Sequence, residues 1–197
     1  MIQNYFTNWC ELPTKFGKFR MYDTGMDGVS LISYSDFSQL INPVLLRVHS
    51  SCSASEVFGS LDCDCADQLQ QSMKLIAKNK EGIIIYLEQE GRGHGLSNKI
   101  KAVSVMQKQN LDTAEAFDSL SLDYDVRSYD LAVKILNRLN VTSVRLISNN
   151  PRKAEYLENS HIDVQEMVKT PTIIRDENRD YLYSKNSKLN HQILLCS

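Results

Sequence analysis

Ile83-Ile84-Ile85-Tyr86-Leu87 is a short, continuous apolar run, and the glycine-rich stretch Gly91-Arg92-Gly93-His94-Gly95 follows it. Such a run is typical of a strand that is covered on both faces of a sheet. A helical pattern follows the glycines over about residues 96–108. The order of strand, turn and helix predicts an α/β unit whose turn can bind an anion through its backbone N–H groups. Because the glycines do not follow the G-x-G-x-x-G pattern, we do not expect a dinucleotide-binding fold.

Elements of the same kind extend outward from this unit. Apolar residues at helical spacing begin after Asp67 and stop at Glu81-Gly82. Asn150-Pro151 is typical of a helix start, with asparagine as the cap and proline at the first position. The other predicted elements are a strand at 44–49, a polar loop at about 110–127, a helix at 129–139, a strand at 144–147 and a strand at 164–168.

The first forty residues are richer in strand patterns, over 18–22 and 29–34, with turns at Thr24-Gly25 and Asp27-Gly28. The last residues, 175–197, are polar and end in a weak helical pattern. We therefore predict an α/β protein with some α+β character. Its core is a mixed β-sheet with surrounding helices, and its N-terminal part is rich in β-structure. We expect one domain over residues 1–197.

Composition excludes several classes of protein. The chain has 197 residues, a formal net charge of −2, 42% hydrophobic and 23% charged residues, as in ordinary globular proteins. This charge argues against a nucleic-acid binder that depends on bulk positive charge. Without an apolar run of about 18 residues or a signal peptide, we expect no membrane span and a cytoplasmic location with reduced thiols.

Three of the five cysteines lie close together, in the spacing C-x10-C-x-C formed by Cys52, Cys63 and Cys65. Thiolates select zinc or iron–sulfur chemistry, and a cluster usually needs four cysteines. Three ligands on zinc leave one position for water, the arrangement of a catalytic site. The spacing is equally compatible with three ordinary cytosolic thiols. Cys10 and Cys196 stand alone and are interpreted as structural or surface thiols.

More specific motifs occur in a fixed order along residues 45–170. They are Arg47-Val48-His49-Ser50-Ser51-Cys52, Asp62-Cys63-Asp64-Cys65, Gln89-Glu90-Gly91-Arg92, Asn98-Lys99-Ile100, Leu111-Asp112-Thr113, the pair Asp125 and Arg127, and Ser148-Asn149-Asn150-Pro151-Arg152-Lys153. Together this series resembles the GTP cyclohydrolase II family. Weaker similarity extends to both ends, including Glu11-Leu12-Pro13-Thr14.

Members of that family open the imidazole ring of GTP and release formate and pyrophosphate, which gives the diaminopyrimidine ribose phosphate that enters riboflavin synthesis. The resemblance implies a homodimer, a zinc ion on Cys52, Cys63 and Cys65, and magnesium with the triphosphate. It implies that Asp125 accepts a proton and that Arg127 is the nucleophile toward the α-phosphate. The implied GTP contacts are Arg47, Val48, His49, Ser50, Ser51, Gln68, Glu90, Gly91, Arg92, Thr113, Ser148 and Lys153.

Elementary chemistry modifies two of these roles. Guanidinium groups are almost always protonated, so stabilisation of the phosphates is the simpler role for Arg127. Guanine presents N–H donors that need a carboxylate, and Glu90 is the candidate. Lys99 is one of several cations expected to face the triphosphate, and His49 is expected to support the metal site without binding the ion.

The chain departs from the family pattern at Val103, where members carry a tyrosine that is associated with the water-dependent steps. No tyrosine occurs between Arg92 and Asp123. Variants that lack this phenol can release a product that keeps the formyl group. Three functions therefore remain open: the full reaction, arrest at a formamidopyrimidine nucleotide for a specialised pathway, and a non-catalytic, zinc-containing nucleotide sensor. The presence of Asp125, Arg127 and all three clustered cysteines argues against the sensor, because a protein that only binds a nucleotide needs none of these hydrolytic groups.

Overall fold

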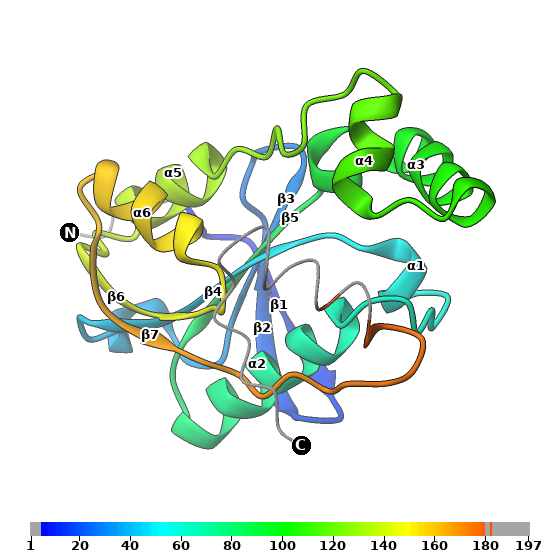
Figure 1. Cartoon of the computed structure of the whole chain (residues 1–197). Helices are drawn as coiled ribbons and strands as arrows, with labels where there is room; N and C mark the ends of the chain where they lie inside the picture. The colour runs from blue at the N-terminus through cyan, green and yellow to red at the C-terminus, as the bar shows by residue number, and fades with distance from the viewer. Residues whose placement is uncertain (1–4, 180–181, 183–197) are drawn as a thin grey trace.

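The computed structural model describes residues 5–179 and 182, and within them it contains one seven-stranded sheet in the order β1-β2-β3-β5-β4-β6-β7 (Figure 1). This confirms the predicted mixed α/β class. The strands are β1 (Trp9–Thr14), β2 (Gly17–Tyr22), β3 (Val29–Ser33), β4 (Val44–Ser50), β5 (Ile83–Leu87), β6 (Ser143–Ile147) and β7 (Asp163–Val168). The helices are α1 (Ser53–Glu56), α2 (Cys65–Asn79), α3 (Gly95–Gln109), α4 (Thr113–Ser119), α5 (Asp130–Arg138) and α6 (Pro151–Asn159), with single 3-10 turns η1 (Phe37–Gln39) and η2 (Gly91–Gly93).

The sheet has an antiparallel half and a parallel half. Strands β1, β2, β3 and β5 pair antiparallel in that order, which confirms the β-rich N-terminal part. Strands β5, β4, β6 and β7 pair parallel. The chain passes from β4 to β5 in one direction and then returns past β4 to β6. The carboxyl ends of β4, β5 and β6 therefore meet at one edge, where open α/β sheets bind their ligands.

Both faces of the central strands are covered. On one face Ile84 packs in a buried cluster with Leu45 and with Ile76 of α2. On the other face Ile83 and Ile85 belong to a larger cluster that includes Leu136 of α5 and Leu157 of α6. Burying each of these side chains contributes about 1.5–3 kcal/mol. The alternation across two covered faces explains why the run at β5 is continuously apolar.

The prediction of a polar loop at 110–127 is wrong, because α4 (Thr113–Ser119) forms there. Asp112 caps this helix through the backbone N–H groups of Ala114 and Glu115, and the Glu115 side chain accepts from the Asp112 N–H. Ala116 and Phe117 of α4 then pack with Ala102 of α3 in a separate small core. The other predicted helices and strands form within a few residues of their expected ends.

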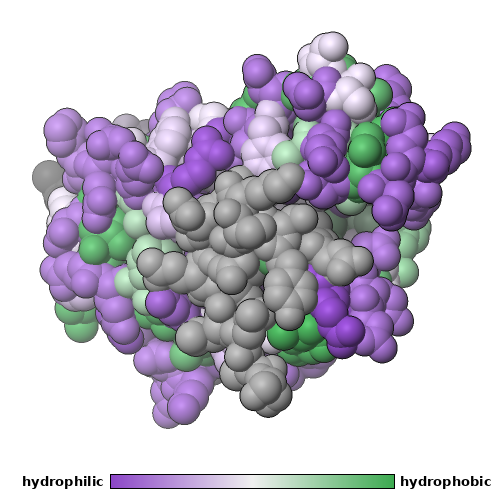
Figure 2. All heavy atoms as spheres, in the orientation of Figure 1, coloured by the Kyte–Doolittle hydropathy of each residue, from purple (hydrophilic) through white to green (hydrophobic). Residues whose placement is uncertain are grey.

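The Asn150 cap is confirmed, since its side-chain oxygen accepts from the Arg152 N–H at 3.0 Å and Pro151 opens α6. The predicted C-terminal helix and Cys196 lie outside the described residues. Hydrophilic residues dominate the described part of the face in Figure 2, with smaller apolar areas between them. Among the helices of the described chain, none has the length and apolar character needed to cross a membrane.

Candidate metal and nucleotide site

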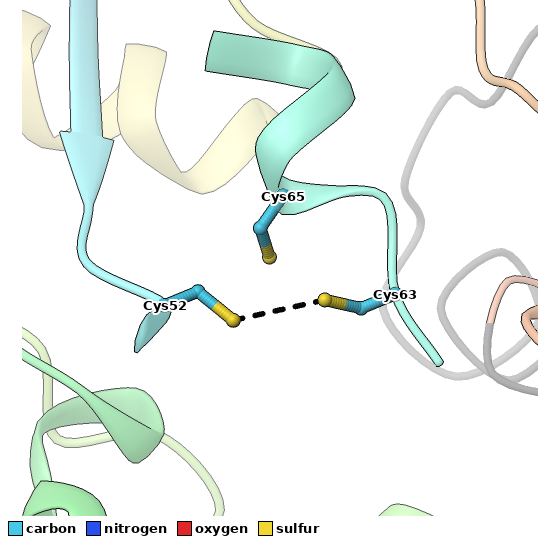
Figure 3. A group of neighbouring side chains, drawn as sticks. All are labelled: Cys52, Cys63 and Cys65. Carbon is cyan, nitrogen blue, oxygen red and sulfur yellow. Dashed lines mark hydrogen bonds between the residues drawn. The ribbon is translucent and has the colours of Figure 1, made fainter. Parts of the chain in front are cut away.

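The three clustered cysteines converge from two elements and the loop between them (Figure 3). Cys52 follows β4 and precedes α1, Cys63 lies in the next loop, and Cys65 is the first residue of α2. Their sulfur atoms all lie within 4.8 Å of one another. Cys10 is exposed on β1, in agreement with its interpretation as a surface thiol, and none of these four described cysteines forms a disulfide.

The spacing of the sulfurs fits a zinc ion. The Sγ atoms of Cys52 and Cys63 are 3.7 Å apart. Tetrahedral zinc with bonds of about 2.3 Å separates two thiolates by about 3.8 Å, whereas a disulfide joins its sulfurs at about 2.05 Å. Three thiol ligands leave a fourth position open on a tetrahedral ion. The donor set and its geometry therefore fit a catalytic zinc site.

A lysine that pairs with a glutamate contacts Cys52. Lys99 of α3 donates to Cys52 Sγ at 3.1 Å and to Glu90 Oε1 at 2.6 Å. The other Glu90 oxygen accepts from the Ser53 backbone N–H at 2.6 Å and from Ser53 Oγ at 2.8 Å. Hydrogen bonds from Cys63, Cys65 and Lys99 lower the pKa of the Cys52 thiol below its usual value.

A buried polar network lies behind the cysteines. Arg47 donates to Gln68 Oε1 at 2.7 Å and contacts His49 Nδ1 at 3.0 Å. Because guanidinium only donates, His49 Nδ1 accepts and its Nε2–H donates to Glu56 Oε1 at 2.8 Å. Glu56 also accepts from the Tyr86 hydroxyl at 2.7 Å. Burial lowers the pKa of His49 to about 4, so the imidazole is neutral at pH 7.

Half of the twelve predicted GTP contacts are buried: Arg47, Val48, His49, Thr113, Ser148 and Lys153. The ammonium of Lys153 donates to the Val48 carbonyl at 2.7 Å. Arg47, Val48 and His49 lie on β4, Ser148 directly follows β6, Lys153 lies in the first turn of α6 and Thr113 begins α4. Ser50, Ser51, Gln68, Glu90, Gly91 and Arg92 are partly exposed. The geometry thus separates an outer group that can touch a ligand from an inner group that supports it.

The predicted catalytic pair forms a closed ion pair. Arg127 donates to Asp125 through Nε at 2.8 Å and through Nη2 at 2.7 Å. Arg152 of α6 also contacts the same carboxylate, at 3.3 Å. Burial alone would raise the pKa of Asp125, but the hydrogen bonds and charge of Arg127 hold it below its usual value. Asp125 is therefore a carboxylate at neutral pH.

The glycine-rich turn connects this ion pair to the cysteines. The Val126 N–H donates to the Arg92 carbonyl at 3.1 Å, and the Arg92 guanidinium lies 3.8 Å from the centre of the Tyr124 ring. Gly93 has φ +94°, and a Cβ there would lie 2.9 Å from Val126 Cγ2. Only a glycine permits this close approach. The turn therefore places the 124–127 segment next to the start of α3.

Sequence reasoning missed the contact between Lys99 and Cys52, and it missed Ser53 and Glu56 entirely. The motif Asn98-Lys99-Ile100 did mark Lys99 as a site residue, but it predicted a contact with the triphosphate and not with Cys52. Val103 lies one helical turn after Lys99. Residues four apart share one face of a helix, so the position that departs from the family pattern lies on the face of α3 that carries Lys99.

Comparisons with known proteins point to one family. The model of the family "GTP cyclohydrolase II" matches residues 6–169. The riboflavin biosynthesis protein RibBA of Bacillus subtilis (strain 168) is 40% identical over 184 residues, which cover 91% of this chain and 46% of that protein. RibBA of Synechocystis sp. is 39% identical over 192 residues, which cover 94% of this chain and 34% of that protein. The chain thus spans less than half the length of these curated relatives.

Among solved structures, RibBX, a two-domain 3,4-dihydroxy-2-butanone 4-phosphate synthase from A. baumannii, has a TM-score of 0.39 and 13% sequence identity. The match covers 84% of this chain and 39% of that one.

Proposed function

Because this chain belongs to the GTP cyclohydrolase II family, we propose that it opens the imidazole ring of GTP by hydrolysis and releases pyrophosphate. One observation carries the proposal: a three-thiol cluster and an arginine–aspartate pair adjoin the same glycine-rich turn. Lys99 joins the cluster to Glu90 at the start of this turn, and Val126 of the catalytic segment bonds to Arg92 within it. The thiol cluster is proposed to serve ring hydrolysis, and the neighbouring arginine–aspartate pair is proposed to serve cleavage of the phosphoanhydride.

Cys52, Cys63 and Cys65 are the proposed ligands of one zinc ion per chain. When bound, zinc would supply a Lewis acid and water that ionises near neutral pH, as attack on C8 of the purine requires. The thiols fix the ion at the carboxyl end of β4.

Cleavage of the anhydride needs positive charge around the triphosphate. Arg92, Arg127 and Arg152 are the proposed phosphate contacts, and magnesium bound with the triphosphate would add to the neutralisation. The bidentate pair with Asp125 keeps the Arg127 guanidinium charged and oriented. This pairing favours electrostatic stabilisation over nucleophilic attack by Arg127. Because its pKa is held low, Asp125 is a weak base. Its proposed role is mainly to orient the Arg127 guanidinium.

The remaining contacts follow the division between the outer and inner groups. Ser50, Ser51, Gln68, Gly91 and Arg92 are proposed to touch GTP. The buried residues are proposed to hold the strand ends in place. Both oxygens of Glu90 already accept from Lys99 and Ser53, which favours a role in holding Lys99 over the guanine contact that the sequence predicts.

The product depends on whether the formamide that ring opening leaves on the pyrimidine is hydrolysed. The RibBA relatives favour the full reaction, with formate release and a product that is used in riboflavin synthesis. Val103 favours the second outcome, because valine can neither orient water nor donate to an oxyanion as a phenol can. A homodimer and a cytoplasmic location stay predictions.

The test is incubation of the zinc-loaded protein with GTP and magnesium, followed by assays of pyrophosphate, formate and product mass. Pyrophosphate and formate together support the full reaction. Pyrophosphate without formate, and a product heavier by one formyl group, support ring opening that stops early. Unchanged GTP overturns the proposal and favours a nucleotide sensor.

A further inference from the structure

Lys99 directs its ammonium group at the thiol cluster. Its Nζ lies 3.1 Å from Cys52 Sγ and 2.6 Å from Glu90 Oε1, and the side chain is only 23% exposed. The ammonium therefore lies within the site, between a thiol and a carboxylate.

The surrounding contacts fix the position of this ammonium. Glu90 holds Lys99 with one oxygen and Ser53 with the other, and Ser53 directly follows Cys52 in the chain. These groups close a ring that joins the start of α1, the turn after β5 and α3. Gly91 allows the ring to close, because a Cβ at this position would come within 3.0 Å of Lys99 Cβ.

The ammonium of Lys99 can balance the charge of a metal ion bound by the three thiolates. Three thiolates and one divalent ion sum to −1, so a single adjacent ammonium makes the centre neutral. A hydrogen bond to a thiolate also stabilises the sulfur lone pair and weakens its donation to a metal. We propose that Lys99 is a positioning residue of the metal centre: it balances the charge of the three thiolates through Cys52, with Glu90 as its anchor. This inference rests on the metal site of the proposed function, but it concerns the bound ion and requires no turnover.

The experiment uses the full chain with Co²⁺ as a spectroscopic probe and Zn²⁺ in competition with a chromophoric chelator. Lys99→Met removes the charge and keeps the stem of the side chain. The expected results are a thiolate-to-cobalt charge-transfer band at longer wavelength and a metal affinity that falls by about 10- to 100-fold. Lys101→Met is the matched control, because Lys101 is exposed on the same helix and donates only to Asn98 among its described contacts.

The position of the band in Lys99→Met decides the proposal. A shift that is absent in Lys101→Met, and smaller in Lys99→Arg because arginine keeps the positive charge, supports it. A band at the wild-type wavelength overturns it even if affinity falls, since a folding defect alone can weaken binding. An equal shift in Lys99→Met and Lys99→Arg also overturns it. Neither readout involves GTP, so failure of the proposed reaction would leave this test intact.

Discussion

His49 shows how burial sets the protonation of a single side chain. It is 2% exposed between Arg47 and Glu56, and burial holds its pKa at about 4. In the unfolded chain a histidine titrates near 6.5. Between these two values the unfolded state binds more protons than the folded state, so stability rises with pH.

We therefore expect His49 to reduce stability as the pH falls from about 6.5 towards 4. The free energy of unfolding should decrease by up to about 3 kcal/mol across this window. Urea unfolding at a series of pH values measures it, with His49→Gln as the reference that lacks this titration. Identical pH dependence in the two proteins would show that His49 is not the group responsible.

Arg127 is the side chain on which phosphate cleavage depends most in this account. Its two hydrogen bonds to Asp125 hold a charged, planar group beside the glycine-rich turn. Arg127→Ala should reduce pyrophosphate release by about 10³-fold or more, as for other arginines that stabilise a phosphoryl transition state. Steady-state kinetics with GTP measure the effect.

Arg145→Ala is a suitable control for that measurement, since Arg145 lies on β6 in a half-exposed ion pair with Glu166. Such pairs contribute about 0–1 kcal/mol, so its kinetics should match those of the wild type. Zinc content should be unchanged in both variants. Full activity in Arg127→Ala would remove this residue from the mechanism.

Among the loops, the glycine-rich turn is the one that holds the site together. Gly93 adopts φ +94°, and an added Cβ would lie 2.9 Å from Val126 Cγ2 and 3.1 Å from the Val126 carbonyl carbon. Gly93→Ala should therefore displace the 124–127 segment and lower turnover, with a smaller effect on zinc content. Gly25→Ala is the matched control, because Gly25 also has positive φ but an added Cβ there would meet nothing within 4 Å. Equal turnover in both variants would contradict the proposed role of the turn.

Helices and strands with a clear apolar period could be predicted from the sequence, and α4 shows where this reasoning stops. Its seven residues, Thr113–Ser119, are too few for a convincing period. The missed signal is the capping box formed by Asp112 and Glu115. The helix is stable because Phe117 packs against α3, a contact that depends on the tertiary fold.

The site divides in the same way. The spacing of Cys52, Cys63 and Cys65 left a metal centre and three ordinary thiols equally open, and the family resemblance implied the metal. The contact of Lys99 with Cys52 joins residues 47 positions apart, and no local pattern fixes how α3 approaches α1. Likewise, the sequence motif marked Arg47 and Lys153 as important but could not show that both are buried.

Across the molecule, the parallel half of the sheet gathers the chemistry at one edge. The cysteines follow β4, the glycine-rich turn follows β5, and Arg152 and Lys153 follow β6. Residues more than 100 positions apart therefore become neighbours, as Lys153 and Val48 do. The antiparallel half carries none of the site residues predicted from the sequence.

The most direct test is the zinc content of the purified chain, measured by elemental mass spectrometry alongside the rate of GTP ring opening in the same samples. The wild type and Cys10→Ser, whose thiol is exposed on β1, should each hold one zinc ion per chain and open GTP. Cys63→Ser should lose most of the zinc and the activity together. A wild-type protein that opens GTP without zinc, or a Cys63→Ser variant that keeps both, would contradict the account.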